Sequence, residues 1–176
     1  GSIYEQKAQY PTALGYYLKA LKIAQNINND LIRATTYGSL GSLYYKQRDW
    51  PKSLKNYEDA LKLLEKYDYY ILQKAGIYGD IGSVLIEMNQ YDRAITSLNK
   101  GLSIAERFGL AKTISDITYF MGLAFHKKKD IKNAKSYYQD AYELKKKVQD
   151  KYGLIALKLQ LGDVYLIEGN VLQAIL

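Results

Sequence analysis

A ladder of small residues at intervals of 40 or 41 positions runs through the chain and limits its fold more than any other feature. The glycines of this ladder are Gly41, Gly82, Gly122 and Gly162. Two further ladders keep the same interval, one formed by Ala13, Ser53, Ala94, Ala134 and Ala174, the other by Ala20, Ala60, Gly101 and Ala141. Three ladders in one phase indicate tandem copies of a single structural unit, as in solenoid proteins.

Each copy has the pattern of two helices joined by a short turn. Apolar residues recur at spacings of three to five between residues 31 and 48, and again from Leu54 to Leu64, as on one face of a helix. Between these runs, Asp49 is suited to cap the second helix, and Pro51 falls near its first position, where a missing N–H is harmless. Equivalent turns are predicted directly before Tyr10, Trp50, Tyr91, Ile131 and Val171. No alternating strand pattern competes, so the sequence predicts an all-α fold.

The small residues have a physical role in such a fold. Two antiparallel helices pack at about 8–10 Å, and the closest approach requires small side chains at the crossing. We therefore expect Gly41 and its counterparts to face residues such as Ser53 and Ala60 where paired helices cross.

The repeated unit resembles the tetratricopeptide repeat. Residues 34–63 carry nearly the whole pattern of that family, namely Tyr37, Leu40-Gly41, Tyr44, Asp49-Trp50, Ser53, Tyr57 and Ala60-Leu61. The resemblance implies a right-handed superhelical solenoid of antiparallel helix pairs. It also implies one array over residues 1–176, with a partial repeat 1 at 1–28, repeats at 29–68, 69–109 and 110–149, and a partial repeat 5 at 150–176.

The unit length departs from the family norm. The family unit has about 34 residues, whereas the interval here is about 40. Longer units of this kind resemble the arrays of cell-polarity scaffolds, peptide-pheromone receptors and bacterial signalling regulators. This likeness favours a signalling or regulatory role within a larger protein.

Composition argues against catalysis, cofactors and nucleic-acid binding. Cysteine is absent and His126 is the only histidine, so no thiolate site or histidine pair can be built, and we expect no enzyme activity, metal or cofactor. The net charge of +7 comes mainly from lysine, whereas phosphate and base recognition favours arginine. The densest basic stretch, residues 145–151, is interpreted as an exposed helix end, with an acidic partner surface as the alternative. No membrane span is expected, and a cytoplasmic location is predicted.

The concave surface is the predicted binding site. In the tetratricopeptide family the first helices of the repeats line a groove, and alignment to the family pattern places the following residues there: Thr35, Gly38, Ser42, Lys46, Gly76, Gly79, Asp80, Ser83, Glu87, Asp116, Tyr119, Phe120, Leu123 and Lys127. Three of these glycines, Gly38, Gly76 and Gly79, are not required by the repeat pattern. A glycine inside a helix costs about 0.5–1 kcal/mol relative to alanine.

Two explanations of these glycines remain open. Either they relieve crowding between neighbouring first helices, or they admit a bulky element such as an amphipathic helix of a protein or peptide partner. In the second case its apolar face would lie on Tyr119, Phe120 and Leu123, and its basic residues would meet Asp80, Glu87 and Asp116. The predicted function is therefore a protein- or peptide-binding module acting through its groove.

A structural spacer that uses its outer faces and ends is the alternative function. The ladders place both ends of the chain inside a repeat, and arrays generally need polar capping helices for solubility. We therefore expect apolar end faces, with Tyr4 near one end and Tyr165 near the other, that allow self-association through the uncapped ends of the array.

Overall fold

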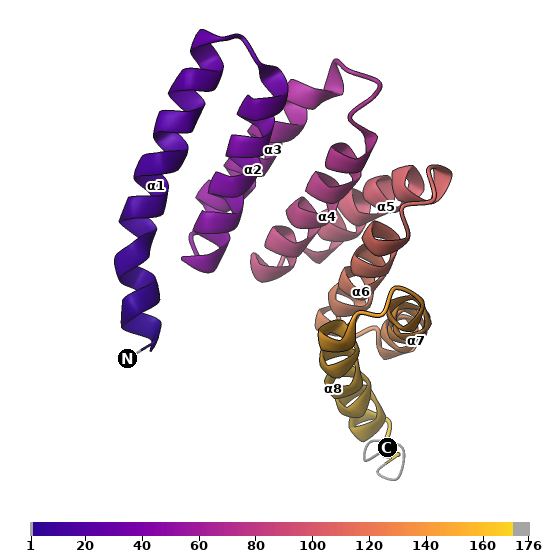
Figure 1. The fold of residues 1–176 in the computed structure, drawn as a ribbon. Helices are drawn as coiled ribbons and strands as arrows, with labels where there is room; N and C mark the ends of the chain where they lie inside the picture. The colour runs from indigo at the N-terminus through magenta and orange to yellow at the C-terminus, as the bar shows by residue number, and fades with distance from the viewer. Residues whose placement is uncertain (1, 171–176) are drawn as a thin grey trace. The chain divides into compact units, whose positions relative to one another are not determined.

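The computed structural model describes residues 2–170, with side chains from residue 9 onward. Eight helices and no strand occupy this range, and they are labelled in Figure 1: α1 (Ser2–Asn26), α2 (Asp30–Lys46), α3 (Trp50–Glu65), α4 (Ile71–Glu87), α5 (Tyr91–Arg107), α6 (Ala111–Lys127), α7 (Ile131–Lys147) and α8 (Lys151–Ile167). The prediction of an all-α helical repeat array is confirmed. None of these helices is both long and apolar enough to cross a membrane.

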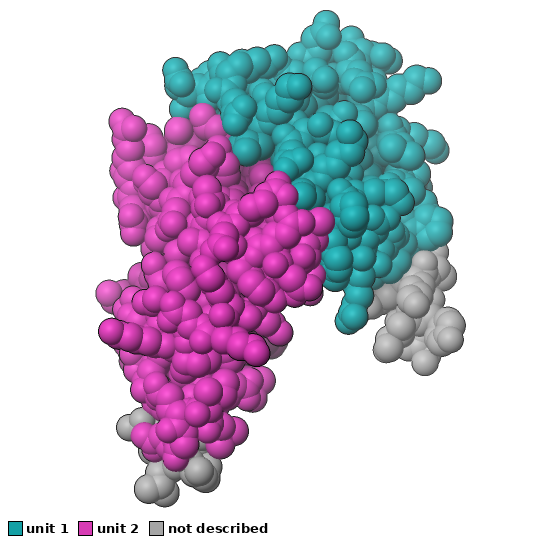
Figure 2. Space-filling view, turned by 180° about the vertical axis from the view of Figure 1, so that it is seen from behind, with its two compact units in different colours: residues 1–70 teal, residues 71–176 magenta. Residues whose placement is uncertain are grey.

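The chain forms two compact units, residues 1–70 and residues 71–176, which Figure 2 distinguishes by colour. The first unit contains α1 to α3, and α2 packs against both of its neighbours there. The second unit contains α4 to α8. Within it, α4 pairs with α5, α6 pairs with α7, and α4 also packs on α6, so the first helices of two successive hairpins lie together.

Glycines lie where the paired helices cross, as the ladder predicts. A Cβ atom added to Gly41 would lie 2.9 Å from the ring of Tyr57, and one added to Gly122 would lie 2.5 Å from the ring of Tyr138. The hydroxyl of Ser53 also donates a hydrogen bond to the carbonyl oxygen of Gly41 at 2.8 Å. The side chain opposite each glycine therefore fills the space that a Cβ atom would take.

Most turns share two features, a residue with positive φ that ends one helix and, in several, an aspartate that caps the next. Asp49, Asp130 and Asp150 each accept a hydrogen bond from a backbone N–H three residues ahead and so cap α3, α7 and α8. The turns contain residues with positive φ: Asn28, Arg48, Asn89, Gly109, Lys129, Gln149 and Gly169. These left-handed residues terminate the preceding helices. The predicted cap at Asp49 and the turns before Trp50, Tyr91 and Ile131 are confirmed.

The turn predicted before Tyr10 is wrong. The helix α1 runs without interruption from Ser2 to Asn26 and contains Pro11. Residues 5–9 read Glu-Gln-Lys-Ala-Gln, all good helix formers, with none of the Gly, Asn or Asp residues that open the other turns. The helix propensity of residues 5–9 therefore outweighs the turn position that the repeat interval predicts. The turn predicted before Val171 lies at the edge of the described residues, and Val171 and Ala174 lie outside them.

Candidate functional site

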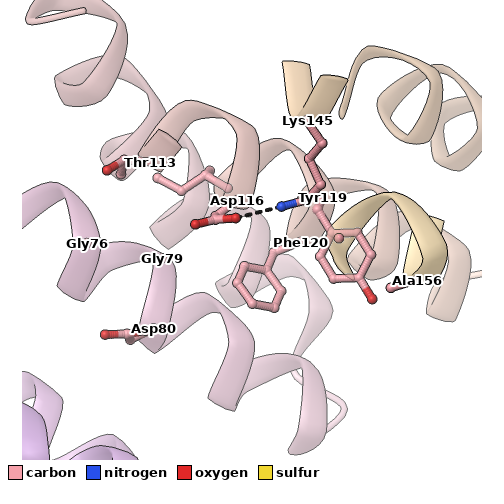
Figure 3. Close-up of a pocket in the computed structure, with 11 residues that line it drawn as sticks. Gly76, Gly79, Asp80, Thr113, Asp116, Tyr119, Phe120, Lys145 and Ala156 are labelled. Atoms are coloured by element: carbon pink, nitrogen blue, oxygen red, sulfur yellow. Dashed lines mark hydrogen bonds and ion pairs between the residues drawn. The ribbon is translucent and has the colours of Figure 1, made fainter. Parts of the chain in front are cut away.

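A pocket of about 380 Å³ lies in the second unit and is shown in Figure 3. Its walls come from α4, α6, α7 and α8, and its lining residues are Gly76, Gly79, Asp80, Thr113, Asp116, Ile117, Tyr119, Phe120, Lys145, Gly153 and Ala156. Most of these residues belong to the first helices of successive hairpins. Such helices carry the side chains that we expected to form a groove.

The structure brings part of the predicted site together. Six predicted residues line the pocket: Gly76, Gly79, Asp80, Asp116, Tyr119 and Phe120. Four others on the same helices do not line it, namely Ser83, Glu87, Leu123 and Lys127. Ser83 is buried, and its hydroxyl donates to the carbonyl oxygen of Asp80 in its own helix at 2.8 Å.

The remaining predicted residues lie on α2 in the first unit. They are Thr35, Gly38, Ser42 and Lys46. Thr35 and Lys46 are exposed, whereas Gly38 and Ser42 are half-buried. None of the four lines the pocket.

The pocket glycines differ in what surrounds them. A Cβ atom added to Gly76 would meet no atom within 4 Å, so the backbone of α4 is open to the pocket there. A Cβ atom on Gly79 would lie 3.2 Å from the Ile117 side chain. Crowding between neighbouring first helices therefore explains Gly79, but it does not explain Gly76.

Two carboxyl groups with different surroundings share the pocket. Burial raises the pKa of Asp80 to about 6, and the nearby negative charge of Asp116 adds to this shift. No hydrogen bond or ion pair to the Asp80 carboxyl occurs among the described residues. Asp116, by contrast, pairs with Lys145 at 2.7 Å and lies 3.7 Å from the ammonium of Lys112. The side chain of Asp116 remains 41% exposed.

Lys145 is buried next to Asp116, and its side chain is only 5% exposed. Its ammonium donates to Asp116 of α6 and, at 2.8 Å, to Asp150, which caps α8 (Figure 3 shows the first of these bonds). Burial alone would lower the pKa of Lys145, but the two hydrogen bonds outweigh it and hold the pKa above its ordinary value. The interpretation of residues 145–151 as an exposed helix end is therefore wrong for Lys145.

Gly153 makes room for this lysine. A Cβ atom at Gly153 would lie 2.3 Å from a carboxylate oxygen of Asp150 and 2.5 Å from Cδ of Lys145. The first turn of α8 thus approaches the ion pairs closely because residue 153 has no side chain.

Helix α6 also brings two aromatic rings to the pocket. The rings of Tyr119 and Phe120 lie 5.5 Å apart and are tilted by 59°. Behind them, the buried ring of Tyr138 lies 6.2 Å from Tyr119, and its hydroxyl donates to Gln160 at 3.2 Å. His126, in the last turn of α6, places Nδ1 3.3 Å from the same hydroxyl. The pocket therefore combines an acidic wall, an apolar wall and an open stretch of helix backbone.

Sequence reasoning missed five lining residues: Thr113, Ile117, Lys145, Gly153 and Ala156. A signal for one of them was present, because Lys145 continues the ladder of Ala24, Leu64 and Ala105 at the same interval. Each of those three residues is fully buried or nearly so. A lysine in a buried ladder position predicts carboxylate partners.

Two sequence profiles of known proteins match most of the chain. Both describe the tetratricopeptide repeat, one over residues 1–66 and the other over residues 75–108 and 116–148. This chain belongs to the tetratricopeptide-repeat family. The predicted family is thereby confirmed.

Relatives of this tetratricopeptide-repeat chain include signalling and regulatory proteins. Response regulator aspartate phosphatase A of Bacillus subtilis (strain 168) is 23% identical over 137 residues, which are 77% of this chain but only 36% of that protein. The transcriptional activator NprA of Geobacillus stearothermophilus is 23% identical over 154 residues, covering 83% of this chain and 37% of that protein. The chain therefore spans about a third of the length of these relatives.

Solved structures share the fold over almost the whole chain. The apo form of RapI matches 98% of this chain and 63% of its own with a TM-score of 0.86 and 21% identity. The Rap conjugation gene regulator of the plasmid pLS20, solved in complex with the Phr* peptide, matches 99% of this chain and 48% of its own with a TM-score of 0.81 and 23% identity. At such identities the likeness establishes the fold alone.

Proposed function

We propose that the second unit binds a peptide or a segment of a protein partner in the pocket between α4, α6 and α8, and that the chain acts by binding rather than by catalysis. The observation that carries this proposal is the open backbone at Gly76, in a pocket that is also lined by the aromatic rings of Tyr119 and Phe120 and by the carboxyl groups of Asp80 and Asp116. A ligand side chain can approach the α4 backbone there and bury apolar surface.

The size of the pocket favours one or two side chains of a larger ligand. Ligand pockets span about 300–1,000 Å³, and the present one, at about 380 Å³, lies near the lower limit. Its apolar and acidic walls suit an amphipathic segment that presents an apolar side chain to Phe120 and a basic side chain to Asp80. A peptide in extended or helical form satisfies this requirement.

The comparisons support a peptide or protein ligand. The regulator of plasmid pLS20 was solved with a bound peptide, and a further Rap protein was solved with the competence and sporulation factor. Both share the fold of this chain. We infer by analogy that the chain is a module of a larger signalling or regulatory protein. The predicted positions of the second unit outside the pocket, including Glu87 and Lys127, are proposed contacts of a longer ligand, and those on α2, including Lys46, are a separate proposal for the first unit.

The decisive experiment fills the pocket at Gly76. A pull-down with the purified chain, followed by mass spectrometry, supplies a partner, whose affinity is then measured by calorimetry for the wild type and for Gly76→Leu. Leucine at this position projects into the pocket and should weaken binding at least tenfold. Gly15→Leu on α1 is the matched control, because a Cβ atom at Gly15 also meets nothing within 4 Å. Unchanged affinity in folded Gly76→Leu would disprove binding in this pocket.

A second candidate function, assembly with another copy of the chain, is favoured by one feature of α8. Tyr152, Ile155 and Leu159 follow one another on one face of this helix and are 88%, 61% and 67% exposed. The equivalent positions of Ile155 in the preceding hairpins, Ala75 and Ser115, are fully buried. Sedimentation of the wild type and of Leu159→Glu tests this candidate, since the charge should abolish any association through this face.

Tyr165, which we expected near one end of the array, contacts two residues of α7. Its hydroxyl accepts a hydrogen bond from Gln139 at 3.4 Å, and the ammonium of Lys135 lies 4.6 Å from the centre of its ring. The exposed apolar surface of α8 is therefore centred on Ile155 and its neighbours. The side chain of Tyr4 lies outside the described residues.

A further inference from the structure

We propose that Asp80 is a proton-operated switch: the pocket holds the cationic group of its ligand while the Asp80 carboxyl is ionised and releases it on acidification. The inference rests on the proposed function, since it specifies how occupancy of the same pocket is regulated. It is carried by the unequal pairing of two neighbouring carboxyl groups in one partly closed cavity.

The first step is that only one of the two carboxylates has a fixed counter-charge. Asp116 is held by the buried ammonium of Lys145 at 2.7 Å. The partly buried carboxyl of Asp80 has no hydrogen-bond or ion-pair partner among the described residues, although both groups line the same pocket. A proton arriving from solvent therefore goes to Asp80, because neutralising it removes both a desolvated charge and its repulsion with Asp116.

The second step concerns the other charged groups around α4. From α6, Lys112 lies near Asp116, and burial raises the pKa of Tyr119, so that this hydroxyl stays neutral at physiological pH. From α7, Lys145 keeps its charge because its two carboxylate partners raise its pKa. From α8, the Asp150 carboxylate accepts from Lys145, which lowers its pKa, so it stays ionised.

The remaining helix packed on α4 brings no competing group to the pocket. On α5, the ammonium of Lys100 lies 5.8 Å from the centre of the Tyr78 ring on α4 and not in the pocket lining. His126 lies in the last turn of α6 and faces Tyr138. The pKa of Asp80, at about 6, lies between pH 5 and pH 7, so the charge of this carboxyl changes within that interval.

The third step is the consequence for a ligand. With Asp80 ionised, the three carboxylates of Asp80, Asp116 and Asp150 are balanced only by the two ammonium groups of Lys145 and Lys112, so the site has an excess of one negative charge. A guanidinium or ammonium group placed beside Asp80 supplies the missing counter-charge, and the ring faces of Tyr119 and Phe120 add to the attraction. Protonation of Asp80 removes the negative charge that no protein group balances, so the attraction for the cation falls.

The experiment uses N-acetylarginine amide as the probe and its neutral citrulline counterpart as the ligand control. Binding to the whole chain is followed by NMR at pH 7.5 and pH 5.0, and the Asp80 carboxyl is titrated by ¹³C NMR in the free protein. The apparent affinity falls with the ionised fraction of Asp80, so the arginine probe should bind about tenfold more weakly at pH 5.0. The citrulline probe should show no such change. Asp80→Asn should abolish the pH dependence, and Asp140→Asn, which removes an exposed carboxylate of α7, should retain it.

Several outcomes would overturn the inference. They are an Asp80 titration near the ordinary aspartate value, equal binding of the arginine probe at both pH values, a pH dependence that survives in Asp80→Asn, and no probe binding at either pH. None of them decides the proposed function, which stands or falls with the effect of Gly76→Leu on a captured partner. A partner lost in Gly76→Leu but bound equally at both pH values would refute the switch alone.

Discussion

Lys145 of α7 donates a hydrogen bond of 2.7 Å to Asp116 of α6, although it occupies a position where the other repeats bury an apolar residue. The same ammonium also donates to Asp150 at the start of α8. The buried ammonium of Lys145 therefore links α6, α7 and α8 at the candidate pocket, which the side chain also lines. Removing one partner of a buried ion pair lowers the free energy of unfolding by more than the intact pair contributes, because the remaining charges stay desolvated.

Replacement of Lys145 should destabilise the chain measurably. Lys145→Met keeps most of the volume but leaves Asp116 and Asp150 without their ammonium, and both carboxylates are partly exposed, so water replaces part of the loss. We expect the free energy of unfolding at pH 7 to fall by about 1–2 kcal/mol, less than the 3–5 kcal/mol of a fully buried pair. Urea unfolding followed by circular dichroism measures this change.

The pH dependence of this variant has a defined sign. The hydrogen bond from Lys145 lowers the pKa of Asp150 in the folded state, with the backbone N–H of Gly153 contributing. Its stabilisation is therefore present above the unfolded aspartate pKa and is lost as the pH falls through the folded pKa. The difference between wild type and Lys145→Met should shrink below about pH 4. Lys146→Met, at an exposed lysine, is the control, with an expected change within about 0.5 kcal/mol.

Gly122 should not tolerate a methyl group. The added Cβ would lie 2.5 Å from Cδ1 and 2.7 Å from Cε1 of Tyr138, whose fully buried ring is held by the bond from its hydroxyl to Gln160. The ring cannot move away without losing this bond. Gly122→Ala should therefore lower the free energy of unfolding by about 1–3 kcal/mol. Gly38→Ala is the counterpart, because its Cβ meets nothing, and it should stabilise the chain by about 0.5–1 kcal/mol.

The sequence predicted such crossings well because the repeat provides several independent copies of each position. The spacing of Gly41, Gly82 and Gly122 places them at equivalent points of each hairpin, and close helix packing requires small residues there. The turn before Tyr10 failed for the opposite reason. Local helix propensity over residues 5–9 decides that segment, and the ladders contain no information about it.

The candidate site was predicted less completely than the fold. The family pattern places Gly76, Asp80 and Phe120 on first helices, so their common face followed from the repeat. Gly153 and Ala156 join the pocket only through the packing of α8, and Lys145 joins it from a second helix. Which groove positions enclose a cavity depends on these tertiary contacts, and periodicity alone does not specify them.

Gly109 should be sensitive to substitution because of its backbone and not because of crowding. It ends α5 with a φ of +64°, and a Cβ atom there would meet nothing within 4 Å. A side chain in this left-handed conformation costs about 1 kcal/mol, so Gly109→Ala should destabilise the chain by that amount. Gly15→Ala, equally uncrowded but inside α1, should be neutral or stabilising. Equal thermal shifts for the two variants would contradict a conformational origin.

Asp80 should make the folded chain less stable at neutral pH than it would be without this charge. Burial, with the charge of Asp116, raises its pKa in the folded state to about 6, from an ordinary value of 3.8. For an acid with a raised folded pKa, the folded state binds more protons than the unfolded state between these two values. The free energy of unfolding contributed by Asp80 therefore decreases as the pH rises from about 4 to 6 and is constant outside this interval.

Asp80→Asn removes this titration and should be more stable than the wild type at pH 7.5 by about 2 kcal/mol, after allowance for partial solvent access. The difference between the two proteins should be much smaller at pH 4, where Asp80 is protonated in the folded state and partly protonated in the unfolded state. Urea unfolding of both proteins at half-unit steps of pH measures the difference. Asp140→Asn provides the control for loss of one exposed negative charge. A stability difference that does not change between pH 4 and pH 7.5 would show that the pKa of Asp80 is the same in the folded and unfolded states, and that its carboxyl is not perturbed by the pocket.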